Sequence, residues 1–109
     1  MSNLHLKQNP TLSDIQHYVE DMVVERGFKD QSILQECLML NEEIGELMKC
    51  VRKSHANMRI DANKVYELDA AGEIADILIV LTTIANKLGV NMEQAFRDKE
   101  EKNKQRDWR

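Results

Sequence analysis

The stretch AAGEIADILIVLTTIANKLG, residues 70–89, decides the fold of this chain. From Ile74 to Ala85 its side chains are apolar almost all the way round a helix, a pattern typical of a helix that other helices surround. Gly89 closes the stretch, because glycine readily adopts the left-handed conformation that ends a helix. With the residues just before it, the stretch predicts a central helix over 65–88.

Three further segments repeat apolar residues at helical spacing, and none reads as a convincing strand. Each begins with a side chain that can accept a hydrogen bond from the free N–H groups of a first helical turn. Gly27 supplies a closing residue for the first helix, and residues 54–64 lack a period and are expected to form the longest loop. The expected helices and caps are about 12–26 with Thr11 and Asp14, about 33–53 with Ser32 and Gln35, and a last helix that Asn91 and Gln94 begin.

The composition fits a single all-α domain spanning residues 1–109, an antiparallel bundle of about four helices. Hydrophobic residues make up 42% of the chain, and there is one Pro. A chain of this size buries only somewhat above about 60% of its unfolded surface, so we expect a second subunit to complete the bundle. Whether the homo-oligomer is a dimer or a tetramer stays open. Apolar residues of the second helix are compatible with one buried face: Leu34, Cys37, Leu38, Ile44, Leu47, Met48 and Val51.

The charge pattern excludes several classes of partner. Residues 1–96 hold nine Lys and Arg against fifteen Asp and Glu, whereas residues 97–109 hold six against four. An acidic body is a poor platform for nucleic acid, since affinity for phosphate backbones rests on Lys and Arg. The longest apolar run, Ile77 to Leu81, is far below the roughly 20 residues of a membrane span, and no signal pattern opens the chain. We expect a cytoplasmic protein.

Carboxylates are placed where a purely structural helix would avoid them. Asp69, Glu73 and Asp76 stand at i, i+4 and i+7, and the last two lie inside the most apolar segment. Glu43 and Glu46 form a similar pair on the preceding helix. Buried carboxylates are costly unless cations, hydrogen bonds or water compensate them. Two such pairs on packed helices would bring four carboxylates together.

Four converging carboxylates without His or Cys are hard oxygen ligands, which suit Mg²⁺ or Mn²⁺ better than Zn²⁺. A di-iron site would need a Glu-x-x-His motif, which neither pair supplies. The alternative for the second helix is an exposed face on which Glu42, Glu46 and Lys49 form surface ion pairs. For Glu73 and Asp76 this alternative is weaker, because no basic residue lies within a turn of them.

The basic end of the chain carries a second candidate group. Lys99, Asn103 and Arg106 fall at i, i+4 and i+7 and would align an ammonium, an amide and a guanidinium on one face of the last helix. These donors suit phosphate oxygens. Basic residues also favour the C-terminal end of any helix, so the spacing alone does not decide between the two readings.

These motifs together resemble the MazG-like all-α nucleotide pyrophosphohydrolases, over roughly residues 12–107. The resemblance rests on E-x-x-E at Glu43 and Glu46, E-x-x-D at Glu73 and Asp76 after a loop, and K-x-x-x-N-x-x-R from Lys99 to Arg106. It implies Mg²⁺-dependent hydrolysis of a (deoxy)nucleoside triphosphate to the monophosphate and pyrophosphate, as in house-cleaning of the nucleotide pool.

The resemblance also implies roles for individual residues. Glu43, Glu46, Glu73 and Asp76 would be the catalytic metal ligands, and Lys99, Asn103 and Arg106 would hold phosphates. Lys53, on the same strip as Glu46, is a further phosphate candidate. Glu36 and Asp69 lie on the same helix faces as the proposed ligands. Each is a candidate for orienting a water molecule or for supporting a metal ligand.

The base pocket and the preferred base stay open. Residue types that stack on a base or bond to it occur near the first helix and the end of the chain. The candidates are Gln16, His17, Phe28 and Trp108. A competing interpretation is a non-catalytic acidic helical module for dimerisation or interaction, in which the carboxylates face water.

Overall fold

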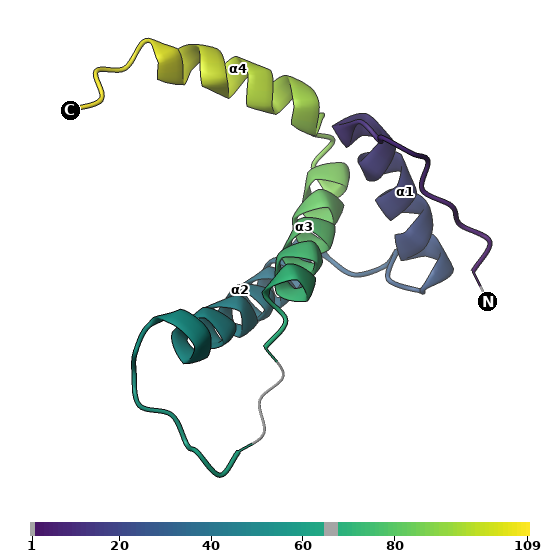
Figure 1. The fold of residues 1–109 in the computed structure, drawn as a ribbon. Coiled ribbons are helices and arrows are strands. Elements are labelled where there is room, and N and C mark those ends of the chain that lie inside the picture. Colours follow the sequence, from purple (N-terminus) through teal and green to yellow (C-terminus); the bar gives the residue numbers. More distant parts are fainter. Residues whose placement is uncertain (1, 65–67) are drawn as a thin grey trace. The chain divides into compact units, whose positions relative to one another are not determined.

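The computed structural model describes residues 2–64 and 68–109 (Figure 1). In these residues the chain forms four α-helices and no strand, which confirms the all-α prediction. Residues that contact one another form two compact units. The first is Met1–Gln31 with Thr82–Arg109, and the second is Ser32–Leu81. No described helix is both long and apolar enough to cross a membrane. The helices are α1 (Leu12–Glu25), α2 (Ile33–His55), α3 (Ala70–Lys87) and α4 (Met92–Lys104).

The predicted N-terminal caps of α1 and α2 are both present as capping boxes. At α1 the Thr11 hydroxyl accepts a hydrogen bond from the Asp14 N–H at 3.0 Å, and the Asp14 carboxylate accepts one from the Thr11 N–H at 2.8 Å. Ser32 and Gln35 repeat this exchange at α2, at 3.1 and 2.9 Å. The two boxes satisfy N–H groups that a first helical turn leaves unpaired.

The predicted glycine stops are also confirmed. Gly27 and Gly89 have φ of 80° and 69°, the left-handed region that only glycine adopts without strain. The next residue after each glycine reaches back to its helix: the Val90 N–H, for example, donates to the Ala85 carbonyl at 2.9 Å. Both stops therefore lie within a residue or two of the sequence prediction.

The predicted start of the central helix is too early. Leu68 and Asp69 are not helical, residues 65–67 of the prediction lie outside the described residues, and α3 begins at Ala70. The Asp69 carboxylate accepts a hydrogen bond from the Gly72 N–H at 2.9 Å, and the Asp69 carbonyl accepts one from the Glu73 N–H at 3.0 Å. Asp69 thus supplies a local cap, which competes with continuing the helix towards the N-terminus.

The prediction that α3 is buried on all sides is wrong for one stripe. Val80 and Ile84 are buried, but Ile74, Leu78 and Leu81 are 57%, 39% and 43% exposed. These three residues recur at i, i+4 and i+7, so they share one face. One chain of this size does not supply enough neighbours to cover every side of the helix.

The predicted buried face of α2 is also wrong. Leu34, Leu38 and Met48 are 71%, 61% and 54% exposed, whereas Glu36 and Cys50 are buried. By helical spacing Leu34, Leu38 and Met48 lie on the side of α2 away from these two buried residues, whereas Leu47 lies near Glu36 and is half-buried. Each of the two helices therefore leaves an apolar stripe uncovered within one chain.

Candidate metal and phosphate site

Two helices bring three carboxylates together in the unit formed by residues 32–81. Glu43 comes from the middle of α2, and Glu73 and Asp76 come from the first two turns of α3. One carboxylate oxygen from each residue lies within 4.8 Å of the other two. Glu43 and Glu73 are half-buried and Asp76 is exposed, so the cluster is open to solvent on one side.

Glu46, the fourth predicted ligand, stands close to this cluster without joining the three oxygens within that distance. Its charge acts on the carboxyl groups of both Glu43 and Glu73. Among the carboxylates of α3, Asp76 acts most strongly on Glu43, whereas Glu46 acts on Glu73.

The cluster changes the acidity of two of its members. Removal from water raises the pKa of Glu43 above its ordinary value of 4.5, and the negative charges of Asp76, Glu73 and Glu46 raise it further. Removal from water also raises the pKa of Glu73, and the negative charges of Asp76, Glu46 and Asp69 raise it further, Asp76 most strongly. Both effects penalise the ionised form, so the cluster disfavours its own full ionisation.

The donor set fits a hard divalent cation. Ligand oxygens on opposite sides of one Mg²⁺ stand roughly 4.2 Å apart, which small side-chain rotations reach from the present spacing. No Lys or Arg forms a salt bridge with Glu43, Glu73 or Asp76 within the described ranges. A cation would therefore meet carboxylates that no side chain has already neutralised.

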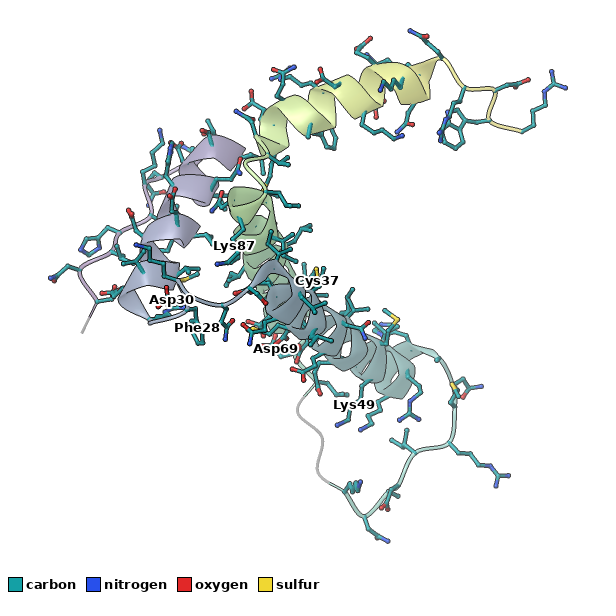
Figure 2. All side chains as sticks on the ribbon, turned by 180° about the vertical axis from the view of Figure 1, so that it is seen from behind. Phe28, Asp30, Cys37, Lys49, Asp69 and Lys87 are labelled. Carbon is teal, nitrogen blue, oxygen red and sulfur yellow. The ribbon has the colours of Figure 1, made fainter. Side chains whose placement is uncertain are left out.

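The two further acids, Glu36 and Asp69, occupy different environments. Glu36 is 2% exposed and lies seven residues before Glu43, on the same face of α2. Asp69 caps α3, and its carboxylate is held by the Gly72 N–H at the start of the helix (Figure 2). A Cβ at position 72 would collide with that carboxylate, so any other residue there would displace the Asp69 side chain. Asp69 therefore has a structural role that its spacing alone did not reveal.

Of the basic residues near the end of α2, the sequence analysis singled out only Lys53, as a phosphate candidate. Removal from water lowers the pKa of Lys53, and the cations of Lys49, Arg52 and Lys64 act in the same direction, whereas the Glu46 carboxylate opposes them. The charges of both a basic group and Glu46 therefore act on Lys53. The signal in the sequence that points to the wider group is the run of cations at positions 49, 52 and 53, at the end of the predicted second helix.

The expected alignment of phosphate donors on α4 is wrong for one residue. Lys99 and Asn103 lie on α4, but the helix ends at Lys104 and Arg106 lies beyond its cap. The Arg106 N–H donates to the Asn103 carbonyl at 3.2 Å in a closing turn. Local turn geometry, rather than helical spacing, therefore sets the position of Arg106.

Trp108 folds back onto this turn. Its indole N–H donates to the Asn103 carbonyl at 2.9 Å, and the Arg106 guanidinium lies 5.8 Å from the centre of its ring. The indole is 71% exposed. The side-chain oxygen of Asn103 is buried and has no hydrogen-bond partner within residues 2–64 and 68–109. Trp108, Arg106 and Asn103 thus form one local group at the end of the chain.

The remaining base-binding candidates lie on α1 or just after it. Gln16 and His17 line a shallow pocket of about 240 Å³. Phe28 is 40% exposed beside the turn that follows α1. Both polar side-chain atoms of Gln16 are hydrogen-bonded within the chain, to Asn86, Val90 and Met92. A base contact at Gln16 would have to compete with these bonds.

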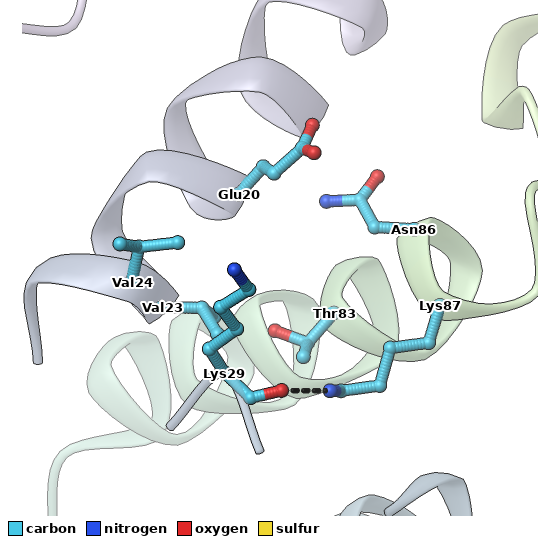
Figure 3. A pocket seen from close by; sticks show the side chains of 7 residues that line it. All are labelled: Glu20, Val23, Val24, Lys29, Thr83, Asn86 and Lys87. Carbon is cyan, nitrogen blue, oxygen red and sulfur yellow. Dashed lines mark hydrogen bonds between the residues drawn. The ribbon is translucent and has the colours of Figure 1, made fainter. Parts of the chain in front are cut away.

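A smaller pocket of about 160 Å³ lies between α1 and the last turns of α3 (Figure 3). Val23 and Val24 supply an apolar wall, and Glu20 and Asn86 stand on another side. The Lys87 ammonium donates to the Lys29 carbonyl at 3.0 Å and ties the turn after α1 to α3. The sequence analysis did not single out this pocket.

Comparison with known proteins identifies the family of the chain. Residues 31–108 match the model of the MazG nucleotide pyrophosphohydrolase domain. The chain also resembles the crystal structure of YpjD from Bacillus subtilis, described as a candidate pyrophosphatase. The TM-score is 0.77 and the identity 29%, over 93% of this chain and 100% of that one. A comparison with curated proteins found no match.

Members of the MazG family are in general metal-dependent. The domain match covers most of the chain and includes both helices of the carboxylate cluster, so the chain belongs to the MazG nucleotide pyrophosphohydrolase family.

Proposed function

We propose that this protein hydrolyses (deoxy)nucleoside triphosphates to the monophosphate and pyrophosphate in a Mg²⁺-dependent reaction, as a house-cleaning enzyme of the nucleotide pool. The observation that carries the proposal is the convergence of the Glu43, Glu73 and Asp76 carboxylates, with oxygens within 4.8 Å, in a chain of the pyrophosphohydrolase family. Water adds to the α-phosphorus, the bond to the bridging oxygen breaks, and pyrophosphate leaves.

Glu43, Glu46, Glu73 and Asp76 would hold the metal, and Mn²⁺ is an expected substitute because it prefers the same oxygen ligands. When bound, a divalent ion neutralises triphosphate charge and makes water a better nucleophile. The raised pKa values of Glu43 and Glu73 support this assignment, since a bound cation relieves the repulsion that raises them.

The chain's own cations have a separate task. Lys99, Asn103, Arg106 and Lys53 would donate hydrogen bonds to phosphate oxygens and orient the triphosphate for attack. Arg106 offers a planar fork that bonds two oxygens at once. Glu36, buried about two turns before Glu43, is a candidate for orienting the attacking water.

His17, Phe28 and Trp108 are the proposed contacts of the base, with Gln16 as a fourth candidate whose existing bonds compete. The exposed indole of Trp108 beside Arg106 supports this choice, because a ring next to a phosphate donor suits a nucleotide. These contacts do not select one base, so the substrate is proposed as a class.

We further propose that the enzyme is a homo-oligomer. The exposed apolar stripes, Leu34, Leu38 and Met48 on α2 and Ile74, Leu78 and Leu81 on α3, support this assembly. Residues of this kind gain about 1.5 to 3 kcal/mol each when fully buried. Sedimentation at micromolar concentration is expected to show a dimer or tetramer, and a monomer would contradict the proposal.

Product analysis over a panel of dNTPs and NTPs tests the proposed reaction. With Mg²⁺ we expect pyrophosphate and the monophosphate, and no orthophosphate or diphosphate. Glu73→Gln is expected to be inactive, and Glu20→Gln, a carboxylate on α1 outside the cluster, serves as the matched control. If the panel shows no Mg²⁺-dependent pyrophosphate release, the alternative of a non-catalytic interaction module is favoured.

A further inference from the structure

Gln16 forms hydrogen bonds to three points around the junction between α3 and α4. Its side-chain NH₂ group donates to the Asn86 side-chain oxygen at 3.0 Å and to the Val90 carbonyl at 2.8 Å. Its side-chain oxygen accepts from the Met92 N–H at 2.9 Å. The Asn86 side chain donates in return to the Gln16 carbonyl at 2.9 Å. All of these residues lie in the same compact unit.

The bond to Met92 begins α4. Met92 is the first residue of this helix, and its N–H is one of the four that a helix cannot pair internally. Asn91 caps the N–H of Gln94 at 3.0 Å, so the first turn of α4 is held by its own cap and by a side chain from α1. Figure 1 shows the start of α4 next to the start of α1.

Apart from its contacts with α1, little in the described part of the chain covers α4. The helix has no buried residue, and Phe96, the largest apolar side chain on it, is 67% exposed. Without a buried apolar face, the hydrogen bonds at its first turn carry much of its placement relative to α1 and α3. The partly buried position of the Gln16 bonds strengthens them relative to bonds in open water.

Loosening this junction would act on residues far along the helix. Asn103 lies eleven residues after Met92, about 16 Å away at 1.5 Å per residue. A tilt of about 10° at the start of α4 would then move Asn103 by roughly 3 Å. Displacements of about 1 Å can cost a hundredfold in rate when they affect groups that orient a substrate.

We infer that Gln16 is a positioning residue: it fixes the start of α4 and thereby places Lys99, Asn103 and Arg106 for the triphosphate. This inference rests on the proposed function, because it takes these three residues as phosphate donors. Gln16 itself need not touch the nucleotide. It acts through the Met92 N–H and the turn at Val90.

Gln16→Met removes all three side-chain bonds at similar volume. We expect kcat/KM for a dNTP to fall at least about tenfold, mostly through KM, since binding of the phosphates is lost in both ground and transition states. Gln16→Glu keeps an acceptor for Met92 but sets a carboxylate oxygen against the acceptor oxygens of Asn86 and Val90, so it should lower kcat/KM as well. Glu20→Gln, one turn later on α1, is the matched control and should keep wild-type parameters.

A double-mutant cycle separates positioning from general destabilisation. In an Arg106→Lys background, the Gln16→Met effect on kcat/KM should shrink to below about threefold, because part of what Gln16 positions is already lost. An equal factor in both backgrounds, or no effect in the wild-type background, would overturn the inference.

Amide hydrogen exchange of the full-length chain provides a readout that needs no turnover. Gln16→Met should speed exchange across residues 92–104 and leave α2 unchanged. Asn86→Ala, which keeps the Met92 bond, should shift the same amides less and serves if Gln16→Met does not fold. Unchanged exchange in α4 contradicts the positioning role. Absence of pyrophosphate release by the wild type, with exchange altered as expected, would reject the proposed function alone.

Discussion

The Asp69 carboxylate lies over Gly72: it accepts the Gly72 N–H at 2.9 Å, and any side chain at position 72 would collide with it. The next N–H, that of Glu73, is held by the Asp69 carbonyl at 3.0 Å. Asp69, one residue before α3, therefore caps the helical turn that carries Glu73, the first proposed metal ligand of this helix.

Gly72→Ala is expected to destabilise the protein and to reduce turnover, because the new methyl group displaces the Asp69 cap. Loss of such a cap typically costs about 0.5 to 2 kcal/mol. Gly45→Ala is the matched control: it lies within α2 with no atom near the added Cβ, and should stabilise by about 0.5 to 1 kcal/mol. Thermal unfolding measures both, and equal shifts would contradict the role of Asp69.

Replacement of single ligands should separate activity from stability. Glu73→Gln or Asp76→Asn is expected to abolish pyrophosphate release, while the metal-free protein stays as stable as the wild type or becomes more stable. The reason is that each change removes a like charge from the cluster. Turnover and melting temperature in chelator test this, and wild-type turnover in either variant would reject the ligand assignment.

Stability without metal should fall as the pH rises above the ordinary carboxyl value of 4.5. The folded protein holds protons on Glu43 and Glu73 more tightly than the unfolded chain does, because both pKa values are raised. Ionisation above pH 4.5 therefore favours the unfolded state until the raised values are passed. Millimolar Mg²⁺ should oppose the loss at neutral pH by mass action. An Mg²⁺-independent melting temperature at pH 7 would favour the interaction module.

Asp14 should show the opposite pH dependence. Hydrogen bonds from the backbone and side chain of Thr11 and from Lys7 lower its pKa from 3.8 to about 2. Its contribution to stability is thus complete above pH 3.8 and disappears as the pH falls towards 2. Asp14→Asn should lower the melting temperature at pH 7, and in paired thermal scans the difference should shrink as the pH falls through about 2. An undiminished difference at and below pH 2 would show that the charge is not responsible.

Arg106→Lys should lower kcat/KM by at least about tenfold, which is about 1.4 kcal/mol of transition-state stabilisation. Lys keeps the charge but cannot bond two phosphate oxygens with a planar fork. Lys104→Ala is the control, since its ammonium is engaged with Glu101 at 3.0 Å. Equal effects of the two changes in steady-state kinetics would mean that the tail acts as diffuse charge.

Part of the candidate site was predictable from the sequence for a local reason. The E-x-x-E and E-x-x-D pairs place carboxylates one turn apart on a helix, and a helix imposes that spacing whatever surrounds it. The convergence of Glu43 with Glu73 and Asp76 depends on how α2 meets α3, as does the position of Glu46 just outside the three-oxygen group. Spacing along one helix carries no information about that distance.

The sequence by itself determined the helices and most of their ends, because capping boxes and glycine stops act within three or four residues. Only the tertiary structure decided which apolar stripes stay exposed, where Asp69 begins α3, and that Gln16 bonds to residues more than 70 positions away. These outcomes depend on neighbours brought together from distant parts of the chain, and periodicity does not distinguish a face that packs within one chain from a face left for another partner.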